Sequence, residues 1–360
     1  MKKIMIRIVQ TILLGVLFLF VTQDVLAADT EKGIGFSVVP ILPTSQIDPN
    51  LGYYYLKTEP GKEQTFEVKL SSQKKENQNI KMFVQDAYTG SNGRSTYGVN
   101  GEKGFNQDET LVNPTSQLIT PVSEEIELGA GEEKVVTFKV APSSESYNGV
   151  KIGRLVFKSS SPDEEKKEAI IEEYQYAISI ILSENGDEYV DGNLQEISLN
   201  DVKPTIKRGK RLVTANLQNK EPKRVMNLEL AARVTKKNSD KVIQETVISD
   251  FQFAPNSNTD LEIDWGLSEL EAGEYTINIS LKNSYDKVHL TKDFRISGEL
   301  AKKINEESAF KIETPNWVKL VAVFNGVLTI AISIAIFIRN KKWLVLSKKK
   351  RRNKRKGKSK

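Results

Sequence analysis

The stretch YTINISL, residues 275–281, alternates large apolar with polar side chains at every position. Successive side chains of a β-strand point to opposite faces of a sheet, so this pattern predicts a strand with one face in a core and the other in water. The same alternation recurs at Phe66–Leu70, Val136–Val140, Tyr174–Ile180 and Leu228–Val234. The chain is therefore expected to consist mainly of half-buried strands.

Turn signals separate these strands, among them Pro60-Gly61, Asn185-Gly186 and Ala272-Gly273, and no long helical pattern lies between them. Many short strands with such turns favour an all-β fold. We predict two immunoglobulin-like β-sandwich domains plus one C-terminal transmembrane helix. The expected ranges are residues 28–158 for the first domain, 159–169 for a polar, charged linker, and 170–297 for the second domain. Because the chain has no cysteine, its cores alone must stabilise it.

The N-terminus has the three parts of a secretory signal peptide, expected over residues 1–27. Lys2, Lys3 and Arg7 form its positive region, and Ile8–Phe20 is its apolar core. Small residues follow, so cleavage is expected after Ala27 or Ala28. The alternative is an uncleaved membrane helix, which the short apolar core disfavours.

A second apolar segment, residues 318–338, is expected to be a transmembrane helix. As a helix it would span about 32 Å, close to the thickness of a bilayer's hydrocarbon core. Trp317 and Trp343 flank it, at the level where amphipathic rings favour lipid headgroups. Before it, Leu300, Ala301 and Ile304 recur at helical spacing, which predicts a juxtamembrane helix within residues 298–317.

Charge divides sharply at this segment. Residues 339–360 carry thirteen Lys and Arg and no acid, whereas residues 28–338 hold 36 basic and 46 acidic residues, a net charge of −10. Positive charge next to a membrane helix marks the cytoplasmic side, so we expect a cell-membrane protein with extracellular domains and a basic cytoplasmic tail. Nucleic-acid binding is the alternative reading of the tail, and we expect no nucleic-acid partner because a stop-transfer signal already explains it.

The residues that usually carry catalysis are scarce. His289 is the one histidine, it lies in an expected strand, and with no cysteine it cannot complete a zinc or cysteine-nucleophile site. Carboxylates are plentiful but spread out, so a glycosidase pair stays open. The acidic turn at residues 184–193 could bind calcium, but its spacing does not match an EF-hand. We predict that the chain is not an enzyme and has no cofactor or metal.

The longest irregular stretch, residues 88–105, is rich in glycine. Loops of this length inside compact domains are often functional. Exposed aromatic rings could stack on sugar faces, whereas the alternative, which we favour, is that the rings fold back onto the sheet. The candidate ligand contacts are Tyr88, Arg94, Tyr97 and Phe105.

Motifs in consistent order along the chain resemble those of the WxL-interacting protein family. In the first half they are the opening FSVVPILPTSQ at 36–46, Tyr55-Leu56, Pro60-Gly61 and GVKIG at 149–153. In the second half they are YQYAI at 174–178, LQN at 217–219, APNS at 254–257, AGEY at 272–275, FRI at 294–296 and AKKIN at 301–305. Ser45 stands where the family often has Asn, and Arg154 stands where a second glycine is common.

This resemblance implies a cell-surface protein of Gram-positive bacteria with a peptidoglycan-binding domain followed by a host-binding domain. It implies peptidoglycan, secreted WxL-domain proteins and host extracellular components as partners, and a membrane-anchored binding scaffold as the function. The alternatives are an extracytoplasmic chaperone for the assembly of surface proteins and, less favoured, a wall hydrolase. Trp265-Gly266-Leu267 reads as a Trp-x-Leu motif, but we expect Trp265 to be a core residue.

Overall fold

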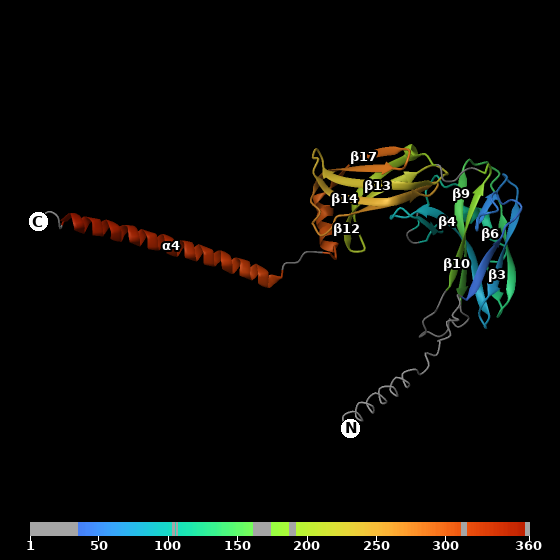
Figure 1. Cartoon of the computed structure of the whole chain (residues 1–360), viewed down its shortest axis with the longest axis horizontal. Helices are drawn as coiled ribbons and strands as arrows, with labels where there is room; N and C mark the ends of the chain where they lie inside the picture. The colour runs from blue at the N-terminus through green and yellow to red at the C-terminus, as the bar shows by residue number, and fades with distance from the viewer. Residues whose placement is uncertain are drawn as a thin grey trace, which may run out of the picture.

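The computed structural model describes residues 35–102, 105, 107–160, 174–186, 192–310 and 315–356. The expected signal peptide, part of the acidic turn and most of the expected linker lie outside these residues. Over the described ranges the chain is mostly β, with two sandwich-like units and one long C-terminal helix (Figure 1). The predicted fold class is therefore confirmed.

Two sheets form the first sandwich. One has the order β1 (Phe36–Ile41), β3 (Gln64–Ser72), β8 (Glu133–Val140), β6 (Ile119–Pro121). The other has the order β2 (Tyr54–Lys57), β10 (Gln175–Ser183), β9 (Val150–Ser160), β4 (Gln78–Thr89), β5 (Ser95–Gly98), and β7 (Glu125–Leu128) also pairs with β4. The one-turn helix α2 (Thr115–Leu118) lies beside β4 and β9.

The core of this unit is aromatic at its centre. Phe66 of β3 faces Phe138 of β8 in register, and their rings stack with centroids 5.4 Å apart. Phe157 of β9, from the opposite sheet, meets Phe138 edge-on at 5.8 Å. The alternation seen in the sequence around Phe66 and Phe138 therefore places one face of each strand in a shared core.

The second sandwich packs a three-stranded sheet on a four-stranded one. The first has the order β11 (Ile197–Lys207), β12 (Lys210–Asn219), β15 (Ser257–Asp264). The second has the order β14 (Val242–Phe253), β13 (Val225–Lys236), β16 (Gly273–Lys282), β17 (Lys287–Ile296), and the one-turn η1 (Leu194–Glu196) precedes β11. The stretch 275–281 lies in β16, and its four large apolar side chains are at most 1% exposed.

Strand order departs from the constant-type immunoglobulin arrangement. There, the fourth strand joins the sheet of the first, second and fifth. Here β14, the fourth strand of the unit, pairs with β13 in the other sheet. Trp265 lies directly after β15, is 3% exposed and meets the ring of Tyr275 edge-on, which fits its expected place in the core.

The boundary between the sandwiches differs from the expected one. Residues 170–183 were assigned to the second domain, but β10 pairs with β9 and with β2 of the first sandwich. Ile178, Ile180 and Leu182 of β10 belong to that core. β9 ends at Ser160 and β10 begins at Gln175, and residues 161–173 between these two neighbouring strands lie outside the described residues.

Two helices follow the second sandwich. α3 (Gly298–Glu307) begins where the Ser297 side chain accepts a hydrogen bond from Leu300 N, and it buries Ala301 and Ile304 as expected. It ends at Glu307, ten residues short of the range expected for a juxtamembrane helix. α4 (Asn316–Lys356) is continuous, and its part from Asn316 to Arg339, 24 residues, is long and apolar enough to cross a membrane.

Candidate functional site at the junction of the two sandwiches

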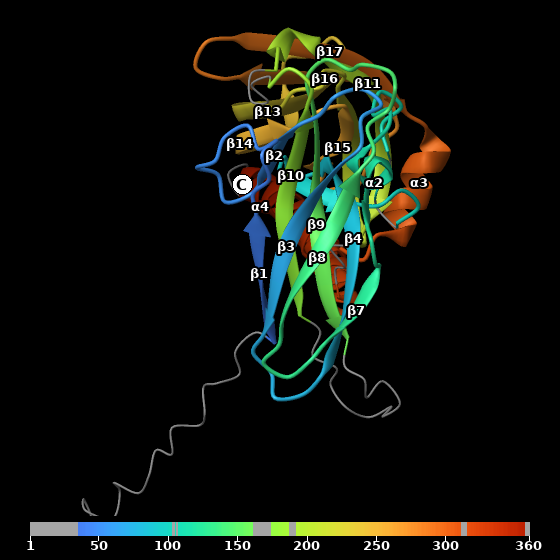
Figure 2. The same ribbon diagram turned by 90° about the vertical axis from the view of Figure 1, so that its right-hand side faces the viewer.

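The hairpin of β4 and β5 projects from the first sandwich and contacts the second. In Figure 2 the first sandwich faces the viewer and the second lies behind it. Gly90 N donates to Arg94 O at 2.9 Å and closes its turn. Gly93 sits at φ +72°, and a Cβ built there would lie 2.1 Å from the ring of Phe251 in β14. A glycine is required here because it permits both the left-handed backbone and the close approach.

Hydrogen bonds fasten this hairpin to the second sandwich. Gly93 O accepts from Gln252 N at 2.8 Å, so the tip caps one end of the β14 edge. Thr89 Oγ1 lies 2.6 Å from Ser257 Oγ and accepts from Ala254 N at 2.9 Å. Thr89 and Ser257 are each 2% exposed, so these bonds are shielded from water.

Asp108 forms a second, buried junction. Its carboxylate accepts from Gln218 Nε2 at 2.9 and 3.0 Å and from Asn258 Nδ2 at 2.7 Å, both in the second sandwich. Thr110 donates to the same carboxylate through its backbone N and its hydroxyl. Burial alone would raise the pKa of Asp108, but these hydrogen bonds outweigh it and hold the pKa below its ordinary value.

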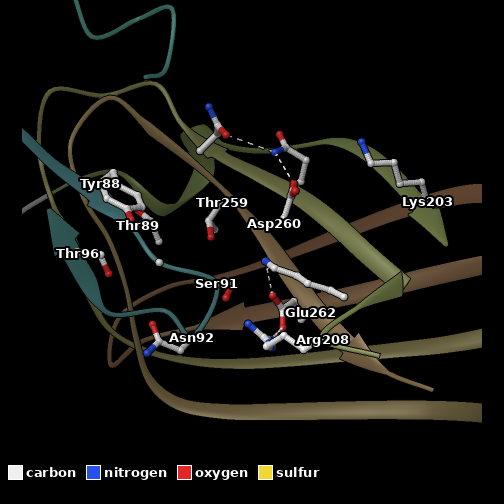
Figure 3. A pocket seen from close by; sticks show the side chains of 14 residues that line it. Tyr88, Thr89, Ser91, Asn92, Thr96, Lys203, Arg208, Thr259, Asp260 and Glu262 are labelled. Atoms are coloured by element: carbon white, nitrogen blue, oxygen red, sulfur yellow. Dashed lines mark hydrogen bonds and ion pairs between the residues drawn. The ribbon is translucent and has the colours of Figure 1, made fainter. Parts of the chain in front are cut away.

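A polar cleft of about 790 Å³ opens between the β4–β5 hairpin and the outer face of the β11–β12–β15 sheet (Figure 3). The first sandwich supplies hydroxyl and amide groups to it, and the second supplies amides, carboxylates and cations. Its lining side chains include Tyr88, Thr96 and Asn92 on one wall and Lys203, Asn216, Asp260 and Glu262 on the other.

The floor of the cleft, where Asn216 and Asp260 lie, is part of a hydrogen-bonded array across three strands. Asn216 Nδ2 donates to Asp260 Oδ1 at 2.9 Å, and Asn200 Nδ2 donates to Gln218 Oε1 at 2.9 Å. Asn216 Nδ2 also donates to Asn258 Oδ1 at 3.4 Å. Side chains in such an array have fixed orientations, and their oxygens keep further lone pairs to accept hydrogen bonds from a ligand. Groups of this kind can recognise hydroxyl and acetamide groups.

Charge in the cleft is partly neutralised. Glu262 pairs with Lys207 at 2.7 Å and with Arg208. Burial acts to raise the pKa of Glu262, but these two cations outweigh it and lower the pKa below the ordinary value. Lys203 makes a looser pair with Asp201 at 3.7 Å, in which both side chains are well exposed. Lys203 is therefore the cation best placed to meet a carboxylate entering the cleft.

The four residues singled out in the sequence lie in four different environments. Tyr88 lines the cleft, and its ring meets that of Phe105 edge-on at 4.9 Å. Phe105 is 9% exposed, so it packs back onto the sheet. Arg94 pairs with Asp250 of β14 at 2.6 Å, across the junction. The ring of Tyr97 lies under the guanidinium of Arg154 at 4.8 Å.

Tyr88 has the environment of a hydrogen-bond donor. Burial, and to a smaller extent the negative charge of Glu102, raises its pKa, so the phenol keeps its proton at neutral pH. Of the four residues, it is the one that lines the cleft.

Sequence reasoning did not find Asp108, Gln218, Asn258 or the amide floor. The only signal is that Asn216 and Gln218 are amides that alternate with the apolar residues Ala215 and Leu217 in β12. His289 lies exposed in β17, as expected for a strand residue. Among the described residues, no group of three or more His, Cys, Asp or Glu is placed to hold a metal ion.

Two family models match consecutive parts of the chain. The peptidoglycan binding domain of WxL Interacting Protein matches residues 36–159, and its host binding domain matches residues 165–306. The chain belongs to the WxL-interacting protein family. The resemblance drawn from the sequence motifs is thereby confirmed. A WxL-interacting protein carries domains for binding peptidoglycan and host components, and with its apolar C-terminal helix this one has the organisation of an anchored surface protein.

Several solved structures are distantly similar to this WxL-interacting protein. A chain from the chaperone–tip adhesin complex of CFA/I fimbriae has 13% identity and a TM-score of 0.28, with 72% of this chain and 97% of that one covered. The E. coli chaperone DraB has 10% identity and a TM-score of 0.29, with 73% and 98% covered. Pseudomonas aeruginosa CupB2 chaperone has 11% identity and a TM-score of 0.27, with 65% and 93% covered. A search of curated proteins finds no significant match.

The residues matched by the two family domains meet at the cleft. Tyr88 and Thr96 lie in the part matched by the peptidoglycan binding domain, whereas Lys203, Asn216 and Asp260 lie in the part matched by the host binding domain. The cleft of this WxL-interacting protein is thus a shared surface, and the junction contacts at Gly93 and Asp108 fix its two walls.

Proposed function

We propose that the chain is a membrane-anchored binding scaffold on the surface of a Gram-positive bacterium, which binds peptidoglycan, secreted WxL-domain proteins and host components. Residues 1–27 would direct its export, residues 318–338 would span the membrane, and residues 339–360 would form a cytoplasmic tail. The observation that carries this proposal is the polar cleft whose walls come from both family domains.

Peptidoglycan contact at this cleft fits the chemistry of its lining. Peptidoglycan presents sugar hydroxyls, acetamides and peptide carboxylates. Asn216, Asp260 and the hydroxyl of Tyr88 supply donors and acceptors for the first two, and Lys203 supplies a cation for the third. The net charge of −10 on residues 28–338 disfavours non-specific attraction to a polyanionic wall, so binding must depend on such placed groups.

Sedimentation with isolated peptidoglycan tests the proposal. The full-length chain in detergent should sediment with the sacculi. Asn216→Ala and Tyr88→Ala should each weaken binding by about tenfold, the effect of losing roughly 1.4 kcal/mol of binding free energy. The matched control is Asn278→Ala in β16, which removes another surface asparagine that accepts one hydrogen bond, from Thr291 Oγ1.

The outcomes separate two claims. A wild-type chain that stays in the supernatant contradicts peptidoglycan binding itself. Sedimentation that is unchanged by Asn216→Ala and Tyr88→Ala places the contact elsewhere on the molecule.

A second experiment tests the WxL partner. The full-length chain should capture secreted proteins that carry Trp-x-Leu motifs from the same cell. Deleting the gene should then reduce retention of these proteins at the surface without reducing the amount synthesised and folded. A loss of folded partner instead would favour a role in assembly.

A further inference from the structure

Exposed apolar side chains gather at one end of the second sandwich. Leu267, in the loop between β15 and β16, is 54% exposed, Phe310, after α3, is 46% exposed, and Val242, at the start of β14, is 42% exposed. In the described ranges before α4, Leu267 and Phe310 are the only leucine and phenylalanine among the exposed large hydrophobic residues. We call these three residues the end patch.

One buried arginine links two members of the end patch. Arg211 is 2% exposed, and its Nη1 donates to Phe310 O at 2.7 Å and to Leu267 O at 3.5 Å. Its Nε donates to Asn305 Oδ1 at 3.0 Å. Because one nitrogen reaches both carbonyl groups, the backbones of Leu267 and Phe310 lie side by side.

Val242 belongs to the same end. It lines a groove with Trp265 and Ser268, the residues on either side of Gly266 and Leu267. Gln244 Nε2, two residues along β14, donates to Trp265 O at 2.8 Å. The end patch is therefore one surface formed by three separate segments of chain.

The segment that leads to α4 is firmly attached at this end. Asn305 of α3 donates to Leu270 O at 3.0 Å and accepts from Leu270 N at 2.9 Å. Ser308 Oγ and Ala309 N both donate to Gly209 O, in the turn between β11 and β12. The chain is thus held to the sandwich as far as Phe310.

Little chain remains between this attachment and the apolar helix. Only residues 311–314 separate Phe310 from Pro315, and Asn316 begins α4. Five Cα–Cα steps span at most about 18 Å. If α4 crosses the membrane, the end patch must therefore lie close to the outer headgroups, while the junction with the first sandwich occupies the opposite end of the strands.

Charge at this end is balanced. Lys210 pairs with Asp264 at 2.9 Å, Lys236 with Glu271 at 2.8 Å and Lys302 with Glu306 at 3.9 Å. Attraction to an anionic surface therefore does not select the partner. Lys241 and Glu269, which line the groove beside Val242, add one charge of each sign. The exposed apolar side chains of the end patch suit the boundary between lipid headgroups and acyl chains.

From these contacts we infer that the end patch docks on the lipid surface, with Leu267, Val242 and Phe310 entering the headgroup region. The inference rests on the proposed membrane anchoring. Tethering by α4 keeps the patch at a high local concentration next to the bilayer, so a weak apolar contact suffices to hold the second sandwich against it.

Site-specific labelling of the full-length chain tests this inference, and the absence of native cysteine makes it direct. Leu267→Cys and, separately, Val242→Cys carry a polarity-sensitive fluorophore in phosphatidylcholine vesicles that contain nitroxide-labelled lipid. The matched control is Tyr285→Cys, at the opposite end of the sandwich, where the side chain is 88% exposed. Headgroup nitroxide should quench Leu267→Cys and Val242→Cys about threefold more than Tyr285→Cys, since the patch enters the interface.

A fluorophore at Asn325→Cys in α4 distinguishes a failure of the membrane anchoring from a failure of the docking. If acyl-chain nitroxide does not quench it, the anchoring itself is wrong. If it is quenched but Leu267→Cys and Val242→Cys behave like Tyr285→Cys, the anchoring holds and the docking is overturned. A third outcome is that the fluorophores at Leu267→Cys and Val242→Cys report an apolar environment but are not quenched by nitroxide lipid. Another protein surface would then cover the end patch, and the docking on lipid would be overturned as well.

Discussion

Asp108 receives more of the junction's hydrogen bonds than any other described residue. Five donor contacts from Thr110, Gln218 and Asn258 converge on a side chain that is 4% exposed. A buried carboxylate would be costly if unpaired, but here every contact offers a hydrogen to a full negative charge. Its replacement should therefore affect stability far more than the loss of an exposed charge nearby.

Asp108→Asn should destabilise the chain by about 2–3 kcal/mol, because an amide nitrogen would face donors that now meet a carboxylate oxygen. Asp250→Asn is the matched control, since it removes a junction carboxylate that is 46% exposed and should cost at most about 1 kcal/mol. Chemical denaturation of the full-length chain measures both. Equal losses in the two variants would contradict the role assigned to Asp108.

Acid should weaken the junction through the same residue. The pKa of Asp108 is lower in the folded chain than its ordinary value of 3.8, so the folded state binds its proton less readily. The stabilisation is fully present above pH 3.8 and is lost as the pH falls through the lower folded-state pKa. The melting temperature of the wild type should therefore fall more steeply below pH 4 than that of Asp108→Asn. If the melting temperatures of the two proteins fell in parallel with pH, Asp108 would not contribute to the acid sensitivity of the fold.

At the scale of the element, the β4–β5 hairpin does two tasks. As part of the first sandwich, β4 pairs with β9, β7 and β5. Beyond the core its turn leaves the sheet and meets β14, where Gly93 O accepts from Gln252 N. Glycines in the sequence indicated an irregular loop, but only the fold shows that one of them is in contact with a second domain.

Gly93→Ala tests the docking of this hairpin. The new Cβ would meet the Phe251 ring at 2.1 Å and would also occupy a left-handed backbone position. Gly131→Ala is the control, because it has φ +63° and no atom within 4 Å of the added Cβ. Gly93→Ala should cost about 1–3 kcal/mol more than Gly131→Ala in free energy of unfolding, the usual range for overpacking. A difference near zero would mean that the hairpin undocks without cost.

At the scale of the whole molecule, the second sandwich separates its two attachments. The first sandwich contacts it at residues 218–224 and 250–258, whereas α3 packs near Gly209 and Leu270. β13 has 12 residues and spans about 40 Å at 3.3 Å per residue. The junction contacts at Gly93 and Asp108 therefore lie tens of ångströms from the end that leads to α4. The cleft extends from the junction towards that end, because Arg208 lines it and Gly209 O accepts from Ser308 and Ala309.

Distance measurements between spin labels should show that the two sandwiches move as one. Val122→Cys in the first sandwich and Val247→Cys in the second are both well exposed. They should give a single narrow distance distribution in the full-length chain. Gly93→Ala combined with Asp108→Ala should broaden it, whereas the pair Val247→Cys and Tyr285→Cys, within one sandwich, should be unaffected. A broad distribution in the wild-type background would contradict a fixed cleft.

The sequence by itself determined the strands, the two cores and the apolar helix. Side-chain alternation at residues 275–281 shows which face of a strand is buried, because the period of a strand is two whatever its partner. The family also followed from short motifs in order. Alternation does not say which strands pair, however, so it did not indicate that β10 pairs with β9 in the first sandwich.

The tertiary structure alone decided the junction and the cleft. Asp108 and Gln218 are 110 residues apart, and nothing local in either segment marks them as partners. Of the four residues chosen from the long loop, Tyr88 lines the cleft, whereas Arg94 and Phe105 are engaged in contacts across the junction and within the first sandwich. A binding surface made by two domains depends on how they pack, and local sequence patterns do not record that packing.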